Sequence, residues 1–473
     1  MGTVTRSPGT SQGRHWSVSR LVAGVIYGLF GLYLGLVTVA YATDLVFAWQ
    51  LAAVAVLLAA VLGVRLAIDR YRDSEHRQAA LLSVLGFALA VFAMIYQSSS
   101  PGLGLGPSRP LALTVVFVLF LSFLLAVTGP RRYTPVQWAA IGCFMTLSML
   151  YLVHTLAFDP SSSQSRWPIW ALFVMGTNLL VVPRLVPDRV FFWLLSSLGS
   201  LAVLLGLATY GVGEYAIWIF EVRQWSSTPP VPGVDTTLQS VFPNPNGFGL
   251  LSFAGFVAAV VEFHRSLVAR RPLGAGLAIV AGSLCGLGVL LSNARASILA
   301  AMVVVVVYAG YVLGGRRLGA LTLASTVFGV VAVLAGMAVG LIDISSANRF
   351  ELWSASLQAI RDGPLLVGHG GGPASVVIEP YLATETAPSP HNSYLSVVIQ
   401  TGLVGGLAYV GLLGGSIVAG MVDTGELDAA MLAFVTGWAI HQLFESYTMF
   451  HWSLGSVVVT LSVGYLLFGE RAS

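Results

Sequence analysis

The feature that most constrains this chain is a series of apolar stretches, each near the ~20 residues that an α-helix needs to cross the hydrocarbon core of a bilayer. Only 9% of the 473 residues are charged, whereas soluble domains carry about 25%. The sequence therefore predicts an all-α, polytopic membrane helix bundle with about 14 transmembrane helices, or roughly 12 to 14. The stretches that carry this prediction are residues 21–41, 45–64, 79–96, 110–128, 136–157, 190–210, 247–263, 273–291, 296–313, 320–342, 393–420 and 453–468, with weaker ones at 169–182 and 429–447.

Arginine placement predicts the orientation of the bundle. Lysine is absent, so all 23 basic residues are arginine. If the N-terminus is inside and the helices alternate, 17 arginines lie on the inner side and six on the outer side. This split follows the positive-inside rule, so both termini are expected in the cytoplasm. It also explains the formal net charge of +3 without nucleic-acid binding. The exclusive use of arginine indicates a GC-rich, bacterial host, with the chain in its cytoplasmic membrane.

The same pattern divides the chain into segments. The two cysteines, Cys143 and Cys285, lie in apolar stretches, so neither a disulfide framework nor a cysteine metal site is expected. The polar start of the chain predicts a disordered cytoplasmic tail. The predicted segments are this tail at 1–20, a transmembrane bundle at 21–342 with an outer loop at 211–246, a large extracytoplasmic loop at 343–392, and C-terminal transmembrane helices at 393–473.

The large loop is expected to carry short amphipathic helices, the first of them near its start. Asn348, three residues before Glu351, resembles a capping box, and Gly363-Pro364 ends the helix. Arg349 falls in the first turn, where the helix dipole disfavours a cation, so a bound anion explains this arginine better than a structural role does. One apolar face is predicted from residues at helical spacing, namely Phe350, Trp353, Leu357 and Ile360.

His391 stands where the large loop re-enters the membrane. The N-terminus of a helix favours neutral imidazole, which suits a general base. A histidine at a membrane boundary without a chemical role is the plain alternative. Asn392 follows directly, and it is able to cap the helix or to orient a substrate.

Arg295 lies in a tight turn, Ser292–Ser297, between two apolar stretches. An arginine so close to hydrocarbon is costly unless it is paired. Its side chain either reaches lipid phosphates or clamps a diphosphate, for which the guanidinium fork is well shaped. Asn246 ends the motif Phe242–Asn246, where capping of the next helix is favoured over a ligand contact.

Three further residues are weaker candidates. His369 sits in the stretch Gly368–Gly372, which lacks the Lys-Ser/Thr ending of a nucleotide phosphate loop. That stretch predicts a flexible turn or an anion-binding nest. His441 and Glu445, at positions i and i+4 of a weak apolar stretch, are either functional or a buried polar pair that fixes helix packing. Two ligands at this spacing are too few for a metal site.

Together these motifs resemble the O-antigen ligase and O-antigen polymerase superfamily of polytopic membrane glycosyltransferases. The resemblance covers residues 240–410 best, and it includes the Arg349…Trp353 spacing and the sequence His391-Asn392-Ser393-Tyr394-Leu395. It implies transfer of a glycan from a polyprenyl-diphosphate donor to a hydroxyl of a glycan, lipid or protein acceptor, on the outer face of the membrane. The roles that it implies are His391 as the base, Arg295 and Arg349 as diphosphate ligands with Arg361 and Arg223 in reserve, and Asn392, Asn246, Trp353, His369, Glu445 and His441 as supporting residues.

The expected reaction inverts the anomeric carbon, because the acceptor attacks in line with the leaving diphosphate. No cofactor and no metal are expected, since the outer carboxylates are dispersed along the sequence. Two other function classes stay open. A transporter or flippase for a lipid-linked glycan would show internal repeats and ionisable residues within the membrane. A non-catalytic scaffold of envelope assembly would use the large loop for docking, and it would tolerate replacement of His391.

Overall fold

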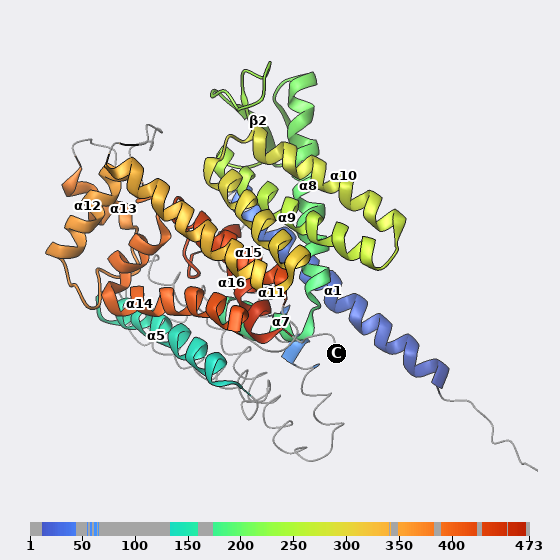
Figure 1. The fold of residues 1–473 in the computed structure, drawn as a ribbon, viewed down its shortest axis with the longest axis horizontal. Coiled ribbons are helices and arrows are strands. Elements are labelled where there is room, and N and C mark those ends of the chain that lie inside the picture. Colours follow the sequence, from blue (N-terminus) through green and yellow to red (C-terminus); the bar gives the residue numbers. More distant parts are fainter. Residues whose placement is uncertain are drawn as a thin grey trace, which may run out of the picture.

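A computed structural model describes residues 12–43, 133–158, 174–339, 349–382, 389–422, 428–451 and 453–469, with the single positions 54, 57, 58, 61–63, 65 and 341. The stretches predicted at 79–96 and 110–128, and much of 45–64, lie outside the described residues. Figure 1 shows a bundle made almost entirely of helices. The helices are α1 Gln12–Thr43, α5 Pro135–Phe158, α7 Val182–Leu185, α8 Asp188–Val212, α9 Pro245–Val268, α10 Pro272–Leu291, α11 Arg295–Ala338, α12 Arg349–Asp362, α13 Ala374–Ile378, a 3-10 turn Glu379–Tyr381, α14 Ser393–Val422, α15 Ala429–His441 and α16 Leu454–Phe468.

The polytopic helical class is confirmed by the length and composition of these helices. Seven of the described helices are long and apolar enough to cross a membrane. Three shorter apolar helices accompany them, namely Val174–Leu185, α15 and α16. The total of about 14 stays a prediction.

α11 consists of two helical legs that fold back on each other at Gly315, whose φ of 62° and ψ of −156° are not helical. A β-carbon at Gly310 would lie 2.3 Å from Oγ1 of Thr322. In a straight helix, residues 12 apart are about 18 Å apart, so the legs must be antiparallel neighbours. The apolar stretches predicted at 296–313 and 320–342 are therefore separate helical legs.

The bundle has two distinct ends. One end lies away from the small sheet described below, and we call it the opposite end. There Arg265 of α9 pairs with Asp188 at the start of α8, and Tyr133 before α5 packs edge-on against Phe468 of α16. The other end carries a small sheet and α12, and we call it the sheet end. From residue 174 onward, the described arginines divide unequally between the ends. Arg184, Arg189, Arg265, Arg270, Arg271, Arg316 and Arg317 lie near the opposite end, and Arg223, Arg295, Arg349 and Arg361 near the sheet end.

The small sheet lies between α8 and α9 and corrects the strictly all-α expectation for the loop at 211–246. Its antiparallel strands, in the order β1-β2-β3, are Tyr215–Ile217, Phe220–Trp225 and Thr237–Ser240. Leu238 packs against α8 where Gly206 leaves room, since a β-carbon there would lie 2.8 Å from it. The alternation of apolar and charged residues in β2 is typical of a half-buried strand, but the many prolines and serines around it obscured this signal.

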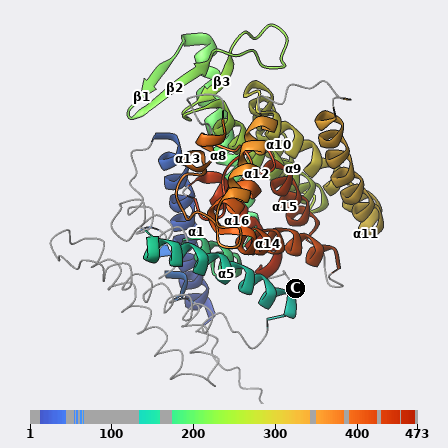
Figure 2. The same ribbon diagram turned by 90° about the vertical axis from the view of Figure 1, so that its left-hand side faces the viewer.

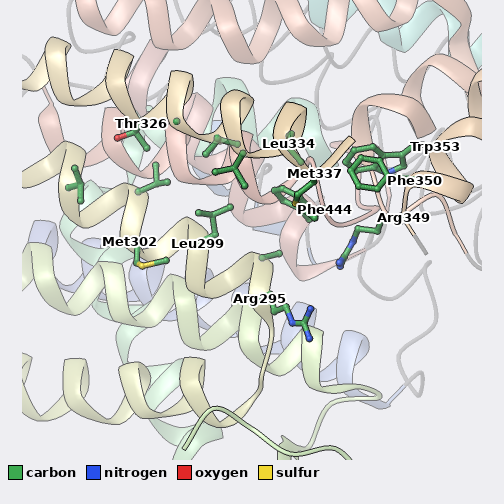
Figure 3. A pocket seen from close by; sticks show the side chains of 16 residues that line it. Arg295, Leu299, Met302, Thr326, Leu334, Met337, Arg349, Phe350, Trp353 and Phe444 are labelled. Carbon is green, nitrogen blue, oxygen red and sulfur yellow. The ribbon is translucent and has the colours of Figure 1, made fainter. Parts of the chain in front are cut away.

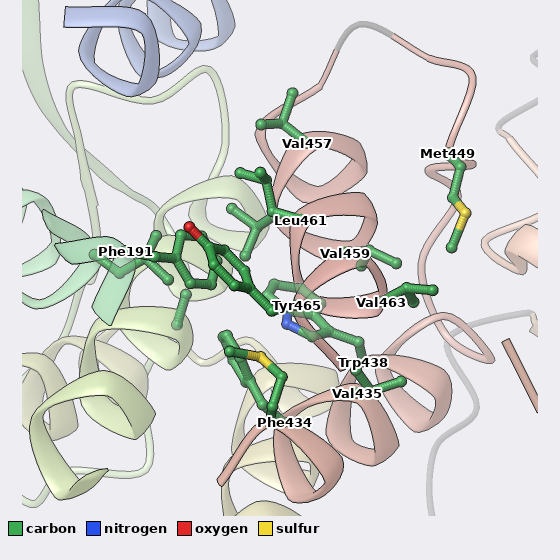
Figure 4. Close-up of a cluster of buried hydrophobic side chains, with 14 of the residues drawn as sticks. Phe191, Phe434, Val435, Trp438, Met449, Val457, Val459, Leu461, Val463 and Tyr465 are labelled. Carbon is green, nitrogen blue, oxygen red and sulfur yellow. The ribbon is translucent and has the colours of Figure 1, made fainter. Parts of the chain in front are cut away.

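An aromatic core holds the shorter helices in place (Figure 4). Trp438 of α15 is fully buried, and its ring packs edge-on against Phe253 of α9 with centroids 4.9 Å apart. Phe191 of α8 stacks on Tyr465 of α16 at 5.2 Å. Burial of such large rings is a main source of packing energy, so these contacts fix α15 and α16 between the longer helices.

The glycine-rich turn after α12 is pinned to a break in α14, and it is not the flexible loop that one interpretation of its sequence allowed. α14 is interrupted at Gly402, which has φ 65° and ψ −169°. The N–H of His369 donates to the carbonyl of Ile399, and the N–H of Leu403 donates to the carbonyl of Leu365. The break frees backbone groups of a membrane helix, and the turn satisfies them.

We expect Gly402→Ala to destabilise the protein by about 3 kcal/mol. A β-carbon at Gly402 would lie 2.2 Å from the carbonyl carbon of Leu366, and a side chain is strained at this positive φ. Gly414→Ala, in the same helix with nothing within 4 Å of its β-carbon, is the matched control, and it should melt at or slightly above the wild-type temperature. Thermal unfolding in nanodiscs measures both. Equal melting temperatures for the two variants would contradict this account of the break.

Candidate functional site

Four residues that are far apart in the sequence meet at the sheet end, and we call them the Glu445 cluster: Asn246, Arg349, His391 and Glu445. The amide of Asn246 donates to Oε1 of Glu445 over 3.0 Å. Nη2 of Arg349 lies 3.7 Å from the same oxygen, and Nδ1 of His391 lies 3.7 Å from Oε2. The carboxylate therefore joins one neutral donor, one guanidinium and one imidazole.

The loop that follows α15 carries Glu445 to this position. Its backbone is tied to the start of α14, because the one hydroxyl hydrogen of Ser393 is shared between the carbonyl oxygens of Glu445 and Tyr447, each 2.7 Å from Oγ. The N–H of Asn392 donates to Oγ of Ser446 over 3.0 Å. The Asn392 side chain accepts from the N–H of Leu395, which is the helix cap that its sequence position suggested. His391 enters this helix with a positive φ of 47°.

Arg349 lies in a setting that favours an anion. Its side chain is 19% exposed, and its Nε is buried with no hydrogen-bond partner among the residues that the structure describes. Burial lowers the pKa of the Arg349 guanidinium; the Glu445 carboxylate acts in the opposite direction, and the charge of Arg295 lowers it further. A further negative charge beside Arg349 would favour the charged form of its guanidinium, as Glu445 does.

An apolar cavity of about 440 Å³ runs from these arginines between the two legs of α11. Figure 3 shows Arg295 and Arg349 at one end of the cavity, beside Phe350, Trp353 and Phe444. Within the described part of the chain, the indole Nε1 of Trp353 is buried and has no hydrogen-bond partner. The remaining lining is aliphatic except for Thr326, and it comes from both legs: Ala296, Leu299, Met302, Val303, Val306, Thr326, Gly329, Val330, Val333, Leu334 and Met337. The cavity thus suits a long apolar ligand with a charged head group.

His441 lies behind the cluster and not in it. Its Nε2 is 3.1 Å from Oγ of Ser297, its Nδ1 is 2.8 Å from the hydroxyl of Tyr447, and its ring stacks on Phe253 at 5.9 Å. His441 is 1% exposed. These contacts join α11 to the loop that carries Glu445. His441 is therefore a buried packing residue, with Ser297 and Tyr447 as its hydrogen-bond partners in place of the pair with Glu445 that the sequence allowed.

Three residues named from the sequence lie apart from the cluster. Arg361 is exposed in the last turn of α12, about 18 Å along the helix from Arg349. Arg223 is exposed on β2, where it pairs with Glu221. His369 is exposed, and its Nε2 lies 3.4 Å from the carbonyl of Ala359.

The structure also corrects three local predictions. Asn244, not Asn246, caps α9 by accepting from the N–H of Gly247 over 2.9 Å. α15 ends at His441, so Glu445 lies in the following loop and does not share a helix face with that residue. Leu357 of α12 is 49% exposed, because the buried face of that helix is formed by Leu352, Ala355, Ser356, Ala359 and Ile360.

Sequence reasoning missed the partners that hold the cluster together. Phe444 lies under the Arg349 guanidinium, 5.9 Å from ring centroid to Cζ, and 6.4 Å from the ring of Trp353. Ser446 binds the backbone at Asn392. Phe444 and Ser446 are the immediate neighbours of Glu445 in the sequence. Inspection of the residues on either side of Glu445 could therefore have identified both. Within the described part of the chain, no three His, Cys, Asp or Glu side chains gather as metal ligands do.

The two asparagines permit a test that separates structure from function. We expect Asn244→Ala to lower the stability of the protein by about 1 kcal/mol through the lost helix cap, with little effect on the Glu445 cluster. Asn246→Ala removes a donor to Glu445 and should lower activity about tenfold with a smaller change in stability. Thermal melting and transfer assays on both variants are the measurements. A loss of activity in Asn244→Ala together with a loss of stability in Asn246→Ala would contradict the geometry.

Residues 277–410 match a family model described as O-antigen ligase, which confirms over this range the resemblance that the motifs indicated. The matched range contains Arg295, Arg349 and His391, and it ends before Glu445. No curated protein matches the chain.

Proposed function

We propose that the protein is a membrane glycosyltransferase of the ligase or polymerase type, because residues 277–410 match an O-antigen ligase family model and several of the described helices are long and apolar enough to cross a membrane. It transfers a glycan from a polyprenyl-diphosphate donor to an acceptor hydroxyl. The observation that carries this proposal is the Glu445 cluster at the mouth of an apolar cavity. A cationic head site and a long apolar cavity match the two chemical halves of such a donor.

The donor diphosphate binds between Arg295 and Arg349, and its hydrocarbon enters the cavity between the legs of α11. Arginine suits this role because its planar fork donates two parallel hydrogen bonds to phosphate oxygens. As the glycosidic C–O bond breaks, negative charge grows on the leaving diphosphate, and the two guanidinium groups stabilise it. The reaction needs no metal and no other cofactor.

His391 is the general base. It takes the proton of the acceptor hydroxyl, of a glycan, lipid or protein, as the oxygen attacks the anomeric carbon opposite the leaving diphosphate, so that the configuration inverts. The nearby Glu445 carboxylate stabilises the imidazolium that forms, in the way that an acid supports histidine in hydrolase triads. Glu445 also holds Arg349, so one carboxylate positions both the base and a diphosphate ligand.

The sheet end faces outward from the bacterial cytoplasmic membrane, and both termini are cytoplasmic. Support comes from the arginines placed from residue 174 onward, of which the larger share lies near the opposite end, as the positive-inside rule requires of the cytoplasmic side. The active site is then extracytoplasmic.

The cavity yields a prediction about donor length. Gly329 lines it and has open space where a β-carbon would be, so Gly329→Leu should obstruct the path of the hydrocarbon. We expect donor with a long polyprenyl chain to bind at least tenfold more weakly, whereas a donor with a short chain should bind as in the wild type. Gly276→Leu, in α10 and also open, is the control. Equal losses for long and short donors would contradict placement of the chain in this cavity.

The proposed function is tested by release of polyprenyl diphosphate from a lipid-linked oligosaccharide by the purified protein, with EDTA present. Release that requires an acceptor hydroxyl, with inversion at the anomeric carbon of the product, would support the enzyme. Absence of release by well-folded protein across several donors and acceptors would overturn it in favour of a transporter or scaffold. Transport of the intact donor across a liposome membrane then separates those two.

A further inference from the structure

The hairpin of β1 and β2 ends in an unusual turn. Ile217 pairs with Phe220, so the turn consists of Trp218 and Ile219. Two-residue turns of this kind favour Asn and Gly, because they require a left-handed backbone, yet Trp218 adopts φ 57°. Its side chain is 89% exposed, and those of Ile217 and Ile219 are 44% and 38% exposed. Three consecutive large apolar residues at a turn are poorly placed in water.

The hairpin continues directly from a membrane helix. α8 qualifies as a span, and only residues 213 and 214 separate it from β1. Exposed apolar residues recur along α8 at helical spacing and form a face for lipid: Trp193, Leu201, Leu204 and Val212. The last of these lies five residues before Ile217. The apolar turn therefore extends a face that the length and composition of α8 suit to lipid.

Contacts with α8 hold the hairpin against the end of the bundle. The hydroxyl of Tyr215 in β1 donates to the carbonyl of Leu205 over 2.6 Å, and the amide of Gln224 in β2 donates to Oγ1 of Thr209 over 2.9 Å. Figure 2 shows the hairpin of β1 and β2 at the edge of the molecule, reaching out past α8. The charges on β2 are paired, since Arg223 binds Glu221, so little free charge opposes an approach to lipid.

We propose that the hairpin tip, which consists of Ile217 and the turn residues Trp218 and Ile219, is a membrane-interface anchor that places Trp218 at the boundary between lipid head groups and acyl chains. Tryptophan prefers this boundary because its ring is apolar and its N–H needs a polar partner. The anchor fixes the height of the sheet relative to the bilayer. Since β3 leads within a few residues to Asn246, it also fixes the height of the Glu445 cluster. This inference does not depend on the proposed function.

The test measures the depth of residue 218 in the full protein in nanodiscs. A spin label at Trp218→Cys, with Cys143 and Cys285 replaced by alanine, is compared for accessibility to oxygen and to a water-soluble nickel chelate. Labels at Leu201→Cys on the lipid face of α8 and at Asp235→Cys on the exposed loop before β3 give the lipid and water references. We expect residue 218 to prefer oxygen, as residue 201 does. A value equal to that of residue 235 would overturn the anchor and favour docking of a soluble partner.

A second measurement keeps the cysteines and covers a failure of the labelled variant to fold. Tryptophan emission is recorded in nanodiscs of brominated lipid for the wild type and for Trp218→Phe. The emission of Trp218 is the difference between the wild-type spectrum and the Trp218→Phe spectrum. Bromine quenches indoles that reach the acyl chains, so this difference should be present in ordinary lipid and quenched in brominated lipid. If that emission is equally strong in both lipids, residue 218 lies in water and the proposal fails.

Discussion

We expect His391→Ala to lower glycosyl transfer by about 10²- to 10⁴-fold, the usual contribution of a positioned general base. The imidazole is the group of the cluster that can take a proton from an acceptor, because Glu445 is engaged with Arg349 and Asn246. Donor affinity should change little, since the diphosphate is held by the arginines. The measurements are the transfer rate at saturating donor and the equilibrium binding of donor to each protein.

The control for this prediction is His369→Ala, the other histidine of the same loop. His369 is exposed and lies against the end of α12, so its loss should lower the rate less than about threefold. His391→Gln keeps a polar side chain and cannot act as a base, so it should be as inactive as the alanine variant. If either His391 variant kept full activity, the protein would still be an enzyme, but His391 would not be its general base.

We expect Arg349→Gln to weaken donor binding by about 30- to 150-fold, which corresponds to about 2–3 kcal/mol for hydrogen bonds to a charged ligand. The variant loses a diphosphate ligand and also leaves Glu445 without its guanidinium partner. The transfer rate should fall further, because charge grows on the leaving diphosphate in the transition state. Arg349→Lys keeps the charge without the fork, so it should lie between the wild type and the glutamine variant.

Arg361→Gln is the matched control because it changes the same residue type in the same helix. Its side chain is exposed at the far end of α12, so donor binding should stay within about twofold of the wild type. Titration with a fluorescent donor analogue measures all three variants, with thermal melting to confirm folding. Similar losses for Arg349→Gln and Arg361→Gln would show that the effect comes from the general charge of the loop, and the placement of the diphosphate would then be wrong.

The sequence alone predicted the parts of this protein that depend on local composition. Long apolar stretches with few charges indicated membrane helices, because lipid cannot satisfy a backbone that is not helical. Gly363-Pro364 indicated where α12 stops, and the structure ends that helix at Asp362. The turn between α10 and α11 was also predictable, because polar Ser292–Ser297 interrupts two apolar runs. The O-antigen ligase resemblance followed from ordered motifs over residues 240–410, and the family match covers residues 277–410 of that range.

The tertiary structure decided which candidates meet. Four arginines were offered by the sequence as diphosphate ligands, and two of them line the cavity. No periodicity in the sequence indicates that Glu445 binds Asn246, which is 199 residues away, or that the two legs of α11 enclose an apolar cavity. Long-range contacts of this kind depend on how whole helices pack, through shape and shared burial, and not on local preference. Composition therefore determined that the chain enters a membrane as helices, whereas packing alone brought His391, Arg349 and Glu445 within reach of one another.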